Sequence, residues 1–86
     1  HGRFRFMAPD LHKTYRLPVV RVGAKRGFVD RHGNVWKEGP YHGKPGPEAP
    51  SFEWDVQLSE AGRRAWGQFA HGKGYVNVTP KGDLSH

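Results

Sequence analysis

The sequence predicts a mostly β fold: a small antiparallel sheet with at most short N-terminal or connecting helical turns. Residues 52–58 alternate apolar and polar side chains without interruption, which is typical of a half-buried strand. Turn-forming Gly, Pro and Asn residues separate the other short apolar runs. The chain has 86 residues, no cysteine, five Phe and three Trp, so these rings have to supply much of one small core.

The N-terminal part predicts one edge strand and two short irregular pieces. Residues 3–6 alternate Arg and Phe, which suits either a short edge strand or an arm that stacks on bases. We favour a structural role, because so small a domain needs its aromatic rings inside. Residues 10–15 allow one helical turn with Asp10 as its N-cap. Residues 17–22 predict a short strand, which Pro18 places at a sheet edge or a strand start.

The middle of the chain predicts a hairpin and a long loop. Residues 23–27 form a basic turn, and residues 27–30 and 34–37 predict paired strands with Gly33 at a positive φ. Residues 39–51 hold four prolines, so they form neither a helix nor a central strand. A loop of this length either closes over a ligand or spans the gap between two strands.

The last forty residues predict an antiparallel meander of four strands. Between the strands, residues 59–66 allow one or two helical turns with Ser59 as N-cap. Residues 66–70 are a further strand candidate, residues 75–79 alternate again, and a Pro-Lys-Gly turn leads into residues 83–86.

The positive charge is concentrated at the N-terminus. Residues 1–31 hold eight basic and two acidic side chains, whereas residues 32–86 hold six of each, so the first third carries the whole net charge of +6. This distribution favours a polyanionic partner, nucleic acid first. No apolar run is long enough for a membrane span, and no amphipathic helix accompanies the charge.

The polar side of residues 52–58 is the first candidate site. Glu53 and Asp55 share one face of the strand and lie about 7 Å apart along it. Two carboxylates on a rigid strand within a basic chain suit proton transfer at a phosphodiester. Solvent-facing strand positions are also commonly acidic for no other reason than exposure, and both interpretations stay open.

Several other chemistries lack their motifs. The sequence has no phosphate-binding glycine loop, no HExxH and no paired zinc-ligand spacing, so we expect no metal and no cofactor. A DNase would normally need such a metal set. No serine lies in a nucleophile-elbow context.

Three blocks carry a family resemblance: GFVDRHGNVWKEGP (27–40), FEWDVQ (52–57) and GYVNVTPKGDLSH (74–86). They resemble the C-terminal nuclease modules of bacterial polymorphic toxins, in particular polymorphic toxin type 17. More distantly, they are similar to the ribosomal-RNA-cleaving cytotoxic domain of certain colicins. The resemblance implies a toxin nuclease domain at residues 27–86, after a basic N-terminal segment at 1–26, within one compact domain overall.

The resemblance implies a metal-independent endoribonuclease toxin with a highly twisted sheet. Such a hydrolase would cleave ribosomal or transfer RNA and so inhibit translation. It would be delivered as the C-terminal part of a larger effector, act in the target-cell cytoplasm as a monomer when free, and meet an acidic cognate immunity protein. Asp55 matches the colicin aspartate, whereas Leu58 and Gly62 replace the other two catalytic residues of that domain.

Metal-free RNA cleavage needs a base, an acid and cations around the phosphate. Asp55 and Glu53 are the candidate bases, or one of them orients a histidine. His86 and His71 are the candidate acids. The candidate RNA contacts are Arg31, Lys37, Lys73, Lys81 and Trp36. The alternative function is a non-catalytic basic nucleic-acid-binding β-domain, which would bind RNA through the same surface and leave it intact.

Overall fold

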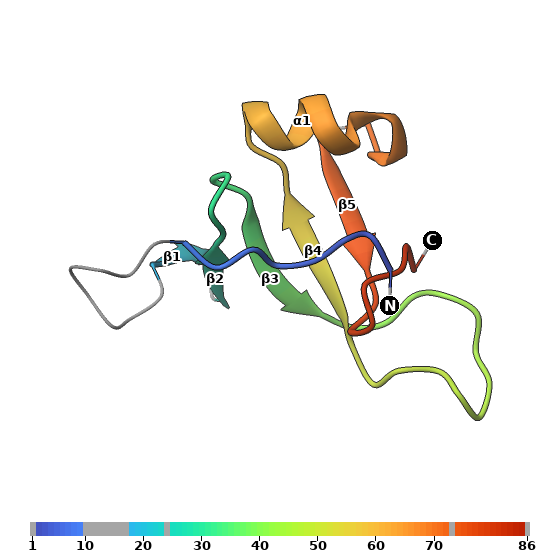
Figure 1. Cartoon of the computed structure of the whole chain (residues 1–86). Helices are drawn as coiled ribbons and strands as arrows, with labels where there is room; N and C mark the ends of the chain where they lie inside the picture. Colours follow the sequence, from blue (N-terminus) through green and yellow to red (C-terminus); the bar gives the residue numbers. More distant parts are fainter. Residues whose placement is uncertain (1, 10–17, 24, 73, 86) are drawn as a thin grey trace.

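A computed structural model describes residues 2–9, 18–23, 25–72 and 74–85. Within them, one antiparallel sheet has the strand order β1-β2-β3-β4-β5, so sequence neighbours are also sheet neighbours (Figure 1). The strands are β1 (Val19–Val22), β2 (Lys25–Val29), β3 (Val35–Gly39), β4 (Glu53–Gln57) and β5 (Tyr75–Val78). The mostly β prediction is confirmed, including the edge strand after Pro18. The helical turn predicted at residues 10–15 lies outside the described residues.

A short helix, α1 (Glu60–Trp66), follows β4 and continues into the 3-10 helix η1 (Gly67–Phe69). The Ser59 N-cap is confirmed, because its Oγ accepts a hydrogen bond from the Gly62 N–H at 3.1 Å. The strand predicted at residues 66–70 is wrong. Trp66 and Phe69 lie three positions apart and both contact Phe4. Helical spacing brings both rings to one face, whereas a strand would point them to opposite faces.

The predicted four-strand meander in the last forty residues is therefore wrong in its count. Among the described residues of that part, only β4 and β5 are strands, and Leu84 forms an isolated bridge with Val78. The predicted Pro-Lys-Gly turn between Val78 and Leu84 is present, since the Gly82 N–H donates to the Thr79 carbonyl at 2.9 Å.

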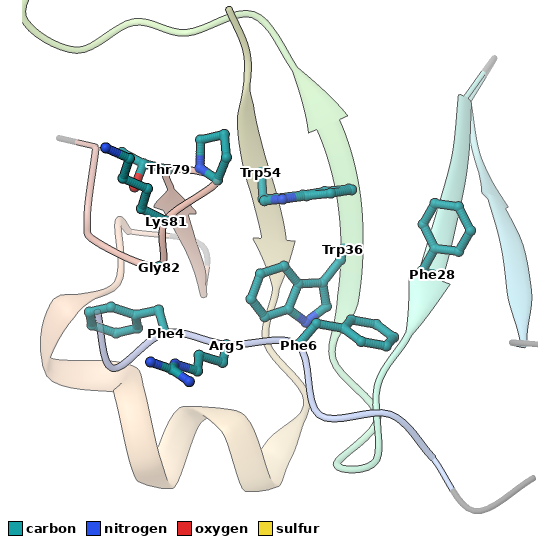
Figure 2. Close-up of a pocket in the computed structure, with 10 residues that line it drawn as sticks. Phe4, Arg5, Phe6, Phe28, Trp36, Trp54, Thr79, Lys81 and Gly82 are labelled. Atoms are coloured by element: carbon teal, nitrogen blue, oxygen red, sulfur yellow. The ribbon is translucent and has the colours of Figure 1, made fainter. Parts of the chain in front are cut away.

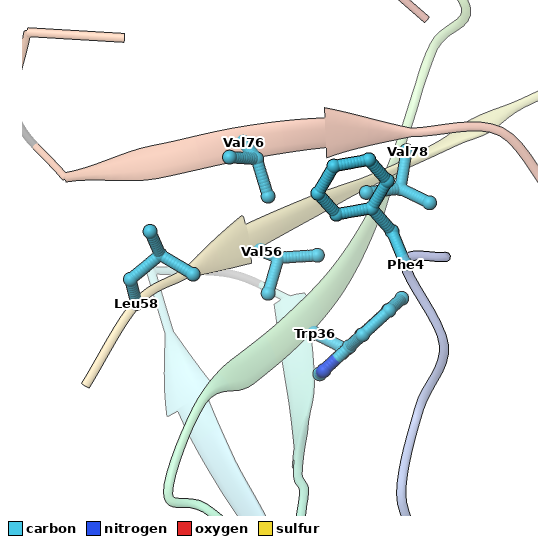
Figure 3. Close-up of a cluster of buried hydrophobic side chains, with 6 residues drawn as sticks. All are labelled: Phe4, Trp36, Val56, Leu58, Val76 and Val78. Carbon is cyan, nitrogen blue, oxygen red and sulfur yellow. The ribbon is translucent and has the colours of Figure 1, made fainter. Parts of the chain in front are cut away.

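One face of the sheet carries the core. Its buried side chains are Phe4, Trp36, Val56, Leu58, Val76 and Val78 (Figure 3). The N-terminal residues 2–9 run across this face, and α1 lies over one end of it (Figure 1). Phe4 meets Trp66 and Phe69 edge to face at 5.1 and 5.3 Å between ring centroids. The structural role predicted for the N-terminal rings is confirmed, but their segment is an extended arm and not an edge strand.

Asp30 organises the hairpin between β2 and β3. Its buried carboxylate accepts hydrogen bonds from the His32 N–H, the Asn34 N–H and side-chain amide, and the Trp36 Nε1–H, all at 2.9–3.0 Å. Gly33 has φ +86°, as predicted for this turn. Because the indole of Trp36 is held by this carboxylate, the hairpin turn fixes the central ring of the core.

Gly62 provides a sharp stability prediction. A Cβ at this position would overlap the Asn34 Oδ1, which accepts the Ser59 N–H at 2.8 Å. We expect Gly62→Ala to lower the free energy of unfolding by about 1–3 kcal/mol, measured by urea denaturation. Gly67→Ala is the matched control, because nothing lies within 4 Å of its added Cβ and its φ is −59°. Equal midpoints for the two variants would contradict the packing described here.

Candidate functional site

The face of the sheet opposite the core carries a row of polar side chains, which we call the polar strip. Strand register pairs Lys37 with Asp55 and Asp55 with Asn77, and directly opposed residues share a face. The next pair along β4 and β5 is Gln57 with Tyr75. The polar strip comprises Lys37, Glu53, Asp55, Gln57, Tyr75 and Asn77. The alternation in residues 52–58 therefore places polar groups on the predicted side of β4.

Asp55 lies at the centre of the polar strip and is accessible. Its side chain is 26% exposed, and its Oδ2 is 3.9 Å from the Lys37 Nζ. The Gln57 Nε2 donates to the other carboxylate oxygen at 3.3 Å. A carboxylate with a cation this close, on a rigid strand and open to solvent, is placed to exchange a proton with a bound hydroxyl.

Glu53 differs from Asp55 because it is only 2% exposed. Its Oε1 accepts the backbone N–H of His42 at 2.9 Å and the hydroxyl of Ser85 at 3.0 Å. The His42 Nδ1 lies 3.9 Å from Oε2. The 39–51 loop and the C-terminal segment thus close over Glu53. Instead of an acid that faces solvent, Glu53 is a buried acceptor that holds His42 at one end of the polar strip.

His71 lies at the other end of the polar strip. Its N–H donates to the Tyr75 carbonyl at 2.8 Å, and the two rings are 5.4 Å apart. Tyr75 pairs with Gln57, one position beyond Asp55 on that face. The polar strip therefore has a histidine near each end, with Asp55 about 7 Å along the strand from Glu53 and from Gln57.

Asn77 is the second buried polar group of the strip. It is 7% exposed and lies opposite Asp55. No donor within the described part of the chain reaches its Oδ1. An unsatisfied buried acceptor costs about 1–3 kcal/mol, so such groups call for a partner.

Two of the predicted site residues cannot be placed, and one residue near the strip was not predicted from the sequence. His86 and Lys73 lie outside the described residues. His42 lies in the 39–51 loop, and no local sequence pattern connects it with Glu53. The sequence did offer one signal, because His42 is the one histidine in the loop that leads into the strand with both acids.

Of the four predicted RNA contacts that lie within the described residues, three lie away from the polar strip. Trp36 is 3% exposed and its Nε1–H donates to Asp30, so the expectation of a surface ring that stacks on RNA is wrong. Its ring lies in the core, where it lines a cavity. The Arg31 Nε donates to the Ala8 carbonyl at 3.2 Å, which ties the N-terminal arm to the β2–β3 turn. Lys81 lines a cavity on the core face. Lys37 alone of these four belongs to the strip.

The described residues contain neither a cluster of metal ligands nor a helix suited to span a membrane. They contain no group of three or more His, Asp or Glu side chains placed to hold a metal ion. Among the helices assigned to the described ranges, none has the length and apolar character needed to cross a membrane.

The fold and the strip define a small, basic antiparallel β domain with a row of polar side chains on the sheet face opposite its core. The family model of Novel toxin 17 matches residues 1–86, and the chain belongs to this family of polymorphic toxin C-terminal domains. The predicted family is confirmed, and the match includes residues 1–26. Membership implies a toxin module delivered to target cells within a larger effector, and a cognate immunity protein. No curated protein and no solved structure matches the chain.

Proposed function

We propose that this toxin module is an endoribonuclease that cuts ribosomal or transfer RNA in the cytoplasm of the target cell. The observation that carries the proposal is the centre of the polar strip, where Asp55 lies 3.9 Å from Lys37 and opposite Asn77. The net charge of +6 supports a polyanionic substrate. RNA brings its own nucleophile, which a site built from carboxylate, lysine and histidine can activate.

Each group has a role in this proposal. The Asp55 carboxylate takes the proton of the 2′-hydroxyl, whose oxygen attacks the adjacent phosphorus. The Lys37 ammonium, 3.9 Å from the Asp55 Oδ2, offsets charge on the phosphorane. The P–O5′ bond breaks as a histidine gives its proton to the leaving oxygen. The products are a 2′,3′-cyclic phosphate and a free 5′-hydroxyl.

Incubation of the purified chain with total RNA and with duplex DNA, in the presence of a chelator, tests the proposed activity. We expect discrete RNA fragments on a gel, cyclic-phosphate ends by enzymatic end analysis, and intact DNA. Intact RNA after long incubation, together with salt-sensitive RNA binding, would support the non-catalytic binding domain instead. DNA cutting would refute the proposal.

The three candidate acids can be separated by substitution. Because Glu53 holds His42 at the polar strip, we expect His42→Ala to slow RNA cleavage by about 10²-fold or more. We expect a smaller loss for His71→Ala, whose ring packs on Tyr75. His86→Ala completes the set. Single-turnover cleavage rates are the measurement, and a normal rate for His42→Ala would transfer the role of acid to another histidine.

The immunity protein should recognise the same charge. We expect it to be acidic and to cover the polar strip or the basic N-terminal third, so that association is steered electrostatically. Stopped-flow measurements should then show an association rate constant that falls steeply between low and high salt. A salt-independent rate constant would exclude this steering.

A further inference from the structure

The core face of the sheet contains a cavity of about 580 Å³ on the side opposite the polar strip. It opens between the N-terminal arm, strands β2–β4 and the turn that follows β5 (Figure 2). Its walls include five aromatic rings, those of Phe4, Phe6, Phe28, Trp36 and Trp54. A volume of this size lies in the range of small-ligand sites, roughly 300–1,000 Å³.

Edge-to-face contacts between neighbouring rings fix the positions of the cavity walls. Phe28 meets Trp54 edge to face at 6.5 Å, Trp54 meets Trp36 at 6.1 Å, and Trp36 meets Phe6 at 5.7 Å. The Trp36 Nε1–H donates to the Asp30 carboxylate at 2.9 Å, which fixes the orientation of the indole. Phe28 and Trp54 are only half-buried, so part of each ring faces the open space. Flat apolar walls held in this way favour a planar ligand.

The polar side chains of the cavity are cationic. Arg5 and Lys81 are both exposed and both line it, with Thr79 as a neutral neighbour. No carboxylate belongs to the described residues that form its wall. Aromatic walls with two cations and no acid match a flat ring that carries a nearby anionic group. A nucleotide has this combination, with its base as the ring and its phosphate as the anion.

The cavity and the polar strip share strand β4. Trp54 lies between Glu53 and Asp55 in the sequence and points to the opposite face. The turn that carries Lys81 directly follows β5, the strand of Asn77, and leads to Ser85 on Glu53. A single RNA strand that passes the Thr79–Ser85 end of the sheet would therefore contact both faces.

We propose that this cavity binds one unpaired base of the RNA substrate, with the adjoining phosphate against Arg5 and Lys81. The inference rests on the proposed function, because the same RNA strand is cut at the polar strip. In this arrangement Lys81 binds a nucleotide that flanks the cut and does not contact the reacting phosphate. This arrangement also restricts the substrate to RNA with an unpaired base beside the cut.

Nucleoside monophosphates are the probes for this site. Titration of the folded chain with each of the four, followed by tryptophan fluorescence, should show saturable binding that is roughly tenfold or more weaker for Phe28→Leu. That variant keeps an apolar side chain and removes the aromatic face. Arg5→Ala combined with Lys81→Ala should weaken binding similarly. Arg63→Ala combined with Arg64→Ala, which removes the same two charges from exposed positions on α1, should not. Ribose 5-phosphate, which lacks the base, should compete at least tenfold less well.

The outcomes separate the two proposals. Folded Phe28→Leu and Arg5→Ala/Lys81→Ala chains that bind nucleotides as the parent does would overturn the base site, and so would equal competition by ribose 5-phosphate. Asp55-dependent RNA cleavage in the same preparations would leave the proposed function standing. If the parent binds nucleotides with the expected dependence on these residues and never cuts RNA, the proposed function fails and the cavity remains a nucleotide site.

Discussion

Asp55→Asn is expected to lower the rate of RNA cleavage by about 10²- to 10⁴-fold, the usual contribution of a positioned general base. The amide keeps the size of the carboxylate and accepts the Gln57 hydrogen bond, but it does not take a proton from a 2′-hydroxyl. Single-turnover cleavage of total RNA measures the rate. Expression of the variant without an immunity protein should also leave bacterial growth unimpaired.

The control for Asp55→Asn is Glu60→Gln. This substitution removes one negative charge from the exposed first turn of α1, and so reproduces the change in net charge away from the polar strip. Its cleavage rate should stay within about twofold of the parent. If Asp55→Asn folds and cleaves RNA at the parent rate, Asp55 is not the base and the proposed mechanism is wrong.

Glu53→Ala is expected to lower both stability and activity. The His42 N–H and the Ser85 hydroxyl would each lose the acceptor that now holds them at 2.9 and 3.0 Å. Loss of a buried hydrogen-bond partner costs about 1–3 kcal/mol, and the 39–51 loop would be released with His42. Urea denaturation gives the loss of stability, and single-turnover cleavage gives the loss of rate.

Glu53→Gln separates structure from charge. The amide oxygen still accepts hydrogen bonds from His42 and Ser85, so most of the stability lost in Glu53→Ala should be restored. The negative charge beside the His42 imidazole is not restored. We expect near-parent stability with a cleavage rate below that of the parent. If Glu53→Ala unfolds at the parent urea concentration, the buried carboxylate does not hold the loop as described.

Local patterns were enough to predict most of the fold. The alternation of residues 52–58 predicted β4 and its two faces, Ser59 predicted the start of α1, and Gly33 predicted the hairpin turn. Each of these features depends on residues close together in the sequence. The strand predicted at residues 66–70 was wrong because an aromatic run favours a strand locally. The helical conformation brings Trp66 and Phe69 together on Phe4, which lies more than sixty residues away in the sequence.

The candidate site was harder to predict, because long-range contacts complete it. Asp55 followed from strand alternation and from the resemblance, and Lys37 joined it only through the β3–β4 register. Burial of Glu53 depends on a loop that carries no regular pattern. Trp36 shows the opposite case: a ring expected to contact RNA is buried in the core, where its Nε1–H donates to Asp30, six residues earlier.

The central claim is that RNA is cut on the polar strip. The most direct measurement is a crystal structure of the Asp55→Asn chain bound to an RNA that covers the mapped cut site and carries a 2′-O-methyl group there. The account predicts the scissile phosphate within about 3 Å of the Lys37 Nζ, with the modified ribose beside residue 55 and Asn77. An RNA bound entirely on the core face or on the N-terminal arm, with the polar strip left in solvent, would contradict it.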